Sequence, residues 1–201
     1  MFFEAYRQLI TSVKSLNWVL TILSILICAL MLLIRHIPGM EIFGVTPNWF
    51  LIWVVSWSII SPVTLPRGMK DALLETTFAY LQGGAGGLIL GLIQDGMTGP
   101  YPSHAPSLTL VGILTVFLHK QAIRHLREDF ISIALVVFGM TLVSETVMAL
   151  QFSSLGHRTL GEIWTAHQQI ALSSAILSSL WAPVLYFPLN RLWRKKYSRS
   201  F

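Results

Sequence analysis

The sequence predicts an all-α integral membrane protein, folded as a bundle of six transmembrane helices. Two observations lead to this prediction. The 201 residues are 54% hydrophobic and 11% charged, with a mean hydropathy of +0.65, which is too apolar for a soluble domain of this size. Six apolar stretches also reach or approach the length of about 20 residues that crosses a bilayer. We expect these spans at about residues 17–34, 48–63, 72–94, 105–118, 130–151 and 168–189.

The basic residues provide a third observation, because their positions alternate with the predicted spans. Of the 14 Lys and Arg residues, all but Arg35 and Arg158 precede the first span or follow the second, fourth and sixth. Basic residues accumulate on the cytoplasmic side of membrane proteins. We therefore expect both termini in the cytoplasm and a single membrane domain over residues 1–201, without a separate soluble domain.

A basic segment, residues 190–201, follows the last predicted span. The net charge of +5 does not require a nucleic-acid partner, because lipid headgroups can account for it. We expect this segment to lie against anionic lipids, and a protein contact is the alternative. Its basic residues are Arg191, Arg194, Lys195, Lys196 and Arg199.

Two of the predicted spans are short. Residues 48–63 and 105–118 would cover only about 24 and 21 Å at 1.5 Å per residue, so they lie beside thinned lipid or meet a loop that dips into the protein. Trp53 and Trp57 repeat at a spacing of four residues within the first of these. We interpret this pair as a packing stripe rather than as a ligand site.

The third span has the most informative pattern. Gly83, Gly87 and Gly91 recur every fourth residue, which removes side chains from one helix face and allows another helix to approach closely. Asp95 takes the next step on this spacing, and we expect it to end the helix. A loop of Gly and Pro residues then leads to His104. Two roles for Asp95 remain open, capping of the loop and binding of a partner.

Glu145 is the acidic residue placed deepest in a predicted span, about 9 Å from the outward end of residues 130–151. An ionisable group at such a depth usually faces protein or water. It either joins helices as a neutral hydrogen-bonding group or contacts a ligand or partner. Histidines are also expected on the outward side of the membrane. They show no H-x-x-x-H spacing and have no cysteine partner, so we expect no metal and no cofactor.

Enzyme activity is not expected from this sequence. It contains no intramembrane Ser–His pair at helical spacing, no H-E-x-x-H motif, no P-loop and no Asp/Glu dyad on one helix. Many transporters contain an internal repeat, and the two halves of this chain show none. A membrane scaffold that holds other membrane proteins is the remaining class.

The pattern of Gly91, Asp95, Gly99, His104 and Gly112 resembles the MreD family of bacterial rod shape-determining proteins. The family combines an apolar run containing glycine, an aspartate, a short loop with glycine and an apolar helix that opens with small residues. Size, number of spans and basic cytoplasmic ends also agree over nearly the full length. The Pro-rich loop and the Trp-rich second span differ from the commoner members and suggest a divergent branch, such as a cyanobacterial one.

The resemblance implies a non-enzymatic part of the machinery that elongates the cell wall, in the bacterial cytoplasmic membrane. It implies binding to an MreC-type bitopic protein and, through that protein, to the MreB filament and the glycan polymerase–transpeptidase pair. It also implies a fold like that of the substrate-binding S components of energy-coupling-factor transporters. The alternative function is therefore an S component that binds a vitamin-like molecule in an outward pocket. Those subunits dock their energising module through small residues of the first span, of which Ser24, Cys28 and Ala29 give a poor version.

Overall fold

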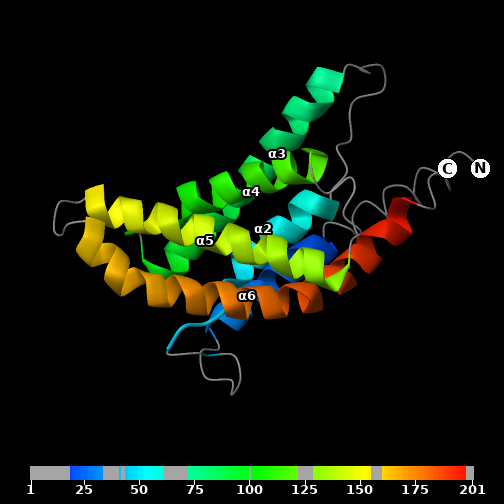
Figure 1. Ribbon diagram of the computed structural model, residues 1–201. Coiled ribbons are helices and arrows are strands. Elements are labelled where there is room, and N and C mark those ends of the chain that lie inside the picture. The colour runs from blue at the N-terminus through cyan, green and yellow to red at the C-terminus, as the bar shows by residue number, and fades with distance from the viewer. Residues whose placement is uncertain are drawn as a thin grey trace, which may run out of the picture.

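The computed structural model of the chain describes residues 19–33, 41, 44–60, 72–99, 101–121, 129–154 and 160–197. Within these residues the fold consists of six helices and no strand (Figure 1). An unlabelled first helix covers Val19–Leu33. The five others are α2 (Trp49–Ile60), α3 (Ala72–Thr98), α4 (His104–Gln121), α5 (Phe130–Ser154) and α6 (Leu160–Tyr197).

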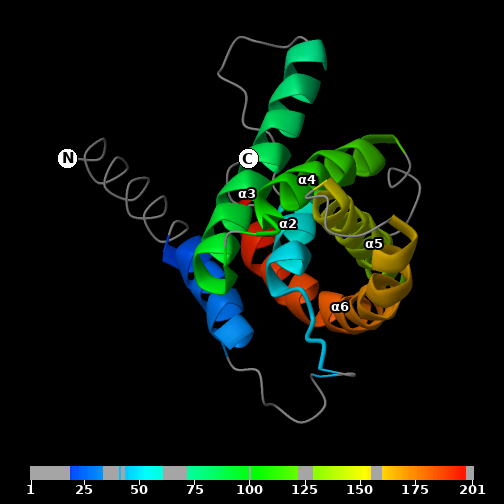
Figure 2. The same cartoon turned by 90° about the vertical axis from the view of Figure 1, so that its left-hand side faces the viewer.

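Two helical hairpins, α3–α4 and α5–α6, surround the short helix α2. Figure 2 shows α2 between them, with the first helix on the outside and the start of α3 extending away from the bundle. Ten of the 12 residues of α2 are buried, and its composition is apolar on all sides. A helix that is hydrophobic all round belongs in a core. The described part of α2 is about 18 Å long, which is shorter than the hydrocarbon core of a bilayer.

Three of the described helices are long and apolar enough to cross a membrane. They contain the segments Thr76–Thr98 of α3, Phe130–Ser154 of α5 and His167–Arg191 of α6. The first helix and α2 are apolar but shorter. Large apolar side chains on the outer faces, such as Leu92 on α3 and Leu135 on α5, are exposed, as expected for a surface in contact with lipid. The chain therefore has the character of a membrane protein.

Helices α3 to α6 are longer than the predicted spans, and this corrects the expected position of Asp95. Helix α3 continues beyond Asp95 to Thr98, so Asp95 lies in its last turn and does not end it. Helix α6 begins at Leu160 and continues to Tyr197, passing through Pro183 and Pro188. Figure 1 shows α6 changing direction towards its C-terminal end. Polar residues at the helix ends extend each helix without extending its apolar stretch.

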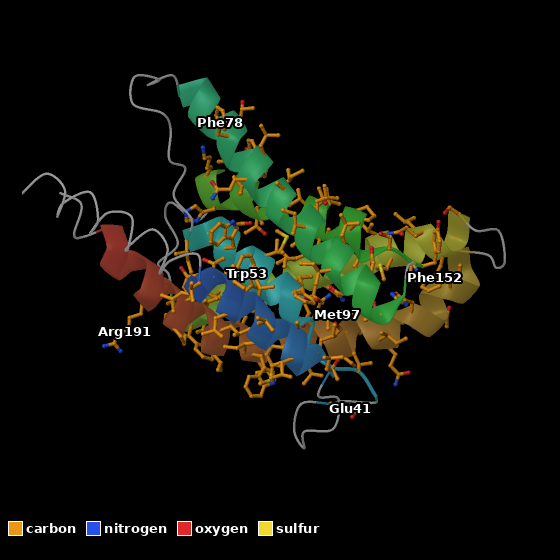
Figure 3. All side chains as sticks on the ribbon, turned by 180° about the vertical axis from the view of Figure 1, so that it is seen from behind. Glu41, Trp53, Phe78, Met97, Phe152 and Arg191 are labelled. Carbon is orange, nitrogen blue, oxygen red and sulfur yellow. The ribbon has the colours of Figure 1, made fainter. Side chains whose placement is uncertain are left out.

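The predicted basic segment is in large part a continuation of α6. Arg191 is exposed on this helix, and Figure 3 shows its side chain pointing away from the bundle. The backbone of Arg194, Lys195 and Lys196 belongs to the same helix, but their side chains lie outside the described part of the chain. Arg199 also lies outside the described residues.

Candidate functional site

The glycines of α3 form the contact with α4 inside the chain. A Cβ atom at Gly83 would lie 2.7 Å from the carbonyl oxygen of Gly112, and one at Gly91 would lie 2.7 Å from the backbone nitrogen of Ala105. A Cβ atom at Gly87 would overlap the carbonyl group of Leu108. Since these neighbours are backbone atoms, they cannot move aside as a flexible side chain could. The glycine stripe thus serves helix packing between α3 and α4.

Gly99 connects α3 to the turn that follows. Its backbone has a φ of +123°, a conformation that residues with a side chain rarely adopt, and its N–H donates a 2.9 Å hydrogen bond to the carbonyl oxygen of Asp95. Glycine is therefore required here by the backbone, although there is open space around its Cα atom.

The carboxylate of Asp95 caps the first turn of α4. One oxygen accepts hydrogen bonds from the backbone N–H and ring Nδ1 of His104, at 2.6 and 2.8 Å. The other accepts from the Ser103 hydroxyl at 2.6 Å and from the Ala105 N–H at 3.4 Å. A negative charge at a helix N-terminus is favourable, because the first N–H groups of the helix point towards it. Capping, one of the two roles left open by the sequence, is thus the role seen in the structure.

Gln151 of α5 holds the same turn from the other side, a contact that the sequence did not predict. Its Oε1 accepts a 3.0 Å hydrogen bond from the Ser103 N–H, while its Nε2 donates a 2.9 Å bond to the Ser103 carbonyl oxygen. The side chain thereby mimics a strand partner and joins the α3–α4 turn to α5. A lone Gln near a helix end gives no sequence signal for such a contact.

Glu145 forms the second acid–histidine contact of the molecule. Its Oε2 lies 2.9 Å from Nε2 of His167 on α6, and both side chains are about 15% exposed. Among the described residues, this is the one hydrogen bond that reaches the Glu145 carboxylate. The contact joins α5 to α6, and it leaves the second carboxylate oxygen available.

A pocket of about 550 Å³ lies next to both acid–histidine pairs. We call it the polar pocket. Segments far apart in the sequence form its wall, including residues 44–48 and parts of α3, α4, α5 and α6. Its polar lining side chains are Glu41, Thr46, Asn48, Gln94, His104, Glu145 and Ser174. The structure thus brings His104 and Glu145, two residues chosen from the sequence, to one cavity.

Gln94 is the unexpected member of this lining. It is 5% exposed, and its Oε1 is buried without a hydrogen-bond partner among the described residues. A buried amide oxygen usually has a partner, because leaving it unpaired costs about 1–3 kcal/mol. Asn48 differs, since its Oδ1 caps α2 by accepting from the Leu51 N–H and its N–H donates to Ser178 Oγ.

The first helix directs its small residues inward. Cys28 is buried in the core, and the Ser24 hydroxyl accepts a 2.9 Å hydrogen bond from Nε1 of Trp53 on α2. Trp53 and Trp57 stack with their ring centroids 5.2 Å apart, which agrees with the expected packing stripe. Figure 3 shows Trp53 next to the first helix.

The polar pocket presents several hydrogen-bonding side chains to a bound molecule. Among the described residues, no three side chains of His, Cys, Asp or Glu gather closely enough to hold a metal ion. Comparisons with models of protein families, with curated protein sequences and with solved structures give no match for this chain. The resemblance to the MreD family therefore rests on the quoted residues and on the expected topology.

Proposed function

We propose that this chain is a non-enzymatic scaffold of the wall-elongation machinery, in the manner of the MreD family. The observation that supports the proposal most is that the residues behind the resemblance all belong to one structural unit, the α3–α4 hairpin. Gly91 and Gly112 lie in the α3–α4 contact, Gly99 shapes the turn, and Asp95 with His104 caps α4. A motif made of interdependent parts of one hairpin is a better family marker than scattered matches.

The proposal also includes a full membrane topology, which goes beyond the three helices that are long and apolar enough to cross a membrane. We propose six spans, with both termini in the cytoplasm of a bacterium and the polar pocket on the outer side of its cytoplasmic membrane. The distribution of Lys and Arg supports this orientation. The proposed partner is a bitopic protein of the MreC type, which in turn contacts the MreB filament and the glycan polymerase–transpeptidase pair.

The internal use of the glycine stripe changes where that partner should bind. Because Gly83, Gly87 and Gly91 already contact α4, a partner helix cannot use the same face without opening the hairpin. The partner is therefore expected on another surface of the bundle. Loss of binding after a change at Gly87 would report a broken hairpin rather than a lost partner contact.

The alternative function, an S component of an energy-coupling-factor transporter, has less support. Such a subunit needs small residues on an accessible face of the first helix for docking. Here Ser24 is bonded to Trp53 and Cys28 is buried, so these residues face the bundle. The polar pocket supports ligand binding, but not the coupling to an energising module.

Affinity purification from membranes tests the scaffold proposal. A tagged copy of the chain should recover a bitopic MreC-type partner, and cells depleted of the chain should lose their rod shape. Gly139→Ala provides a matched control, because a Cβ atom at Gly139 meets nothing within 4 Å, and this variant should recover the partner as the parent chain does. Purification without any bitopic partner, together with unchanged cell shape on depletion, would refute the proposal.

A further inference from the structure

We propose that the polar pocket binds a small organic cation that bears N–H donors, with Oε1 of Gln94 and the carboxylate of Glu145 as its acceptors. This inference goes beyond the scaffold function and does not depend on it. It requires only the bundle itself, since every wall residue belongs to this chain.

The unpaired Gln94 oxygen is the first reason. Gln151, the other amide in this region, uses both its oxygen and its nitrogen on Ser103. Gln94 is more deeply buried, yet its oxygen lacks a hydrogen bond among the described residues. An N–H group of a ligand that donates to this oxygen would supply the missing hydrogen bond and offset the free-energy cost of burying the oxygen.

The charge of the wall is the second reason. Two carboxylates, those of Glu41 and Glu145, line the polar pocket, and none of the lining residues in the described part of the chain is Lys or Arg. His167 bonds to one oxygen of Glu145, and no other described residue bonds to this carboxylate, so its second oxygen can accept from a ligand. Asp95, in contrast, is already fully used by His104, Ser103 and Ala105. Among the described wall residues, an anionic molecule would face the two carboxylates without a Lys or Arg side chain to offset their charge.

The size and mixed character of the wall are the third reason. About 550 Å³ falls within the range of about 300–1,000 Å³ for small-molecule sites. Leu32, Val45 and Ile170 provide apolar wall between the polar groups. A molecule with a short apolar stem and an amine or guanidine head fits this combination better than a bare ion does.

Binding to the purified full chain in lipid nanodiscs tests the inference. The probes are putrescine and agmatine, with succinate as an anionic control of similar length. We expect each amine to raise Tm and to show a measurable Kd by calorimetry, and succinate to do neither. The same preparation, released into a mild detergent for native mass spectrometry, should retain a small cation from the cell.

Two pocket variants and one control locate the binding. Glu145→Gln should weaken amine binding about tenfold or more, because it removes the opposite charge. Gln94→Leu should also weaken binding about tenfold, while raising the Tm of the empty protein by about 2–4 °C, because it removes an unpaired buried oxygen. Gln168→Leu changes an exposed amide of α6 that is not among the pocket's lining residues, so it should alter neither amine binding nor the Tm of the empty protein.

Three results would overturn the inference. The first is the absence of amine binding in the parent chain combined with the absence of a retained small molecule. The second is amine binding that both pocket variants leave unchanged, since the site would then lie elsewhere. The third is binding of succinate as tight as that of the amines, since the pocket would then not select a cation. Because the assay contains only the purified chain, none of these results bears on the scaffold function.

Discussion

The α3–α4 and α5–α6 hairpins each set a carboxylate beside a histidine, yet the two acids have different surroundings. Asp95 accepts hydrogen bonds from three residues around the start of α4. Glu145 accepts one bond, from His167, among the described residues, and it lines the polar pocket. A carboxylate whose two oxygens both accept hydrogen bonds stabilises a turn, whereas a carboxylate with an unused oxygen can bind a ligand. The same residue chemistry thus serves structure in one hairpin and is available for binding in the other.

The glycines differ in the same way between the hairpins. In α3, Gly83, Gly87 and Gly91 face backbone atoms of α4 at distances that exclude any side chain. In α5, a Cβ atom at Gly139 would meet nothing within 4 Å. A glycine in these apolar helices is therefore required only where its helix contacts another helix closely. Six substitutions test how far this difference between the hairpins extends.

The largest effect is expected for Gly87→Ala. The new methyl group would overlap the Leu108 carbonyl group, so the two helices must separate at a cost of about 3 kcal/mol. Thermal unfolding of the purified protein should show a Tm lower by about 6–12 °C. Gly139→Ala, the matched change in α5, should leave Tm unchanged or raise it slightly. Equal effects of the two variants would show that the hairpins do not differ in packing.

A smaller effect is expected for Asp95→Asn. The amide keeps one acceptor oxygen but places an NH₂ group against donors, so we expect a loss of about 2 kcal/mol. Glu145→Gln should cost about 1 kcal/mol, because it weakens a single bond to His167. Chemical unfolding of both variants in the same detergent measures the difference. A larger loss for Glu145→Gln would contradict the distinction between the two acids.

Gln151→Leu should destabilise the protein by about 1.5 kcal/mol. It removes both hydrogen bonds by which the Gln151 side chain ties the Ser103 backbone, in the α3–α4 turn, to α5. Limited proteolysis should detect faster cleavage within residues 99–103. Cleavage at the parent rate would mean that the turn does not depend on α5.

The smallest effect is expected for Gly96→Ala. This glycine lies next to Asp95 in the last turn of α3, but a Cβ atom there meets nothing within 4 Å. Since alanine favours the helix more than glycine does, we expect a gain of about 0.5 kcal/mol. Its Tm should lie at or just above that of the parent protein. A marked loss would mean that the glycines of α3 are required for a reason other than contact with α4.

Much of the fold could be predicted from the sequence. The apolar stretches located the helices, and the four-residue glycine spacing identified the packing face of α3. The identity of the helix that meets this face could not be predicted, because periodicity describes one helix at a time. The sequence equally allowed contact with α4 or with a partner protein. The end of α3 was also placed too early, since a polar residue interrupts an apolar stretch without interrupting a helix.

The polar pocket was only partly predictable. His104 and Glu145 were noticed because ionisable groups near or within an apolar helix are costly and therefore conspicuous. Gln94 and Gln151 were missed, because an amide carries no charge and its importance depends on whether its partners are present in the fold. Asn48 was missed for the same reason, as its link to Ser178 joins residues 130 positions apart.

Disulfide crosslinking tests the central claim, that the glycine face of α3 contacts α4 of the same chain. A Cβ atom at Gly84 would lie 3.1 Å from Cγ1 of Ile113, which is close enough for a disulfide bond between cysteines at these positions. Cys28 is the chain's only cysteine, so Gly84→Cys and Ile113→Cys are combined with Cys28→Ala. Mild oxidation should then give an intramolecular disulfide, whereas Gly96→Cys with Ile113→Cys should give none. Crosslinking only between two molecules, or none at all, would contradict the account.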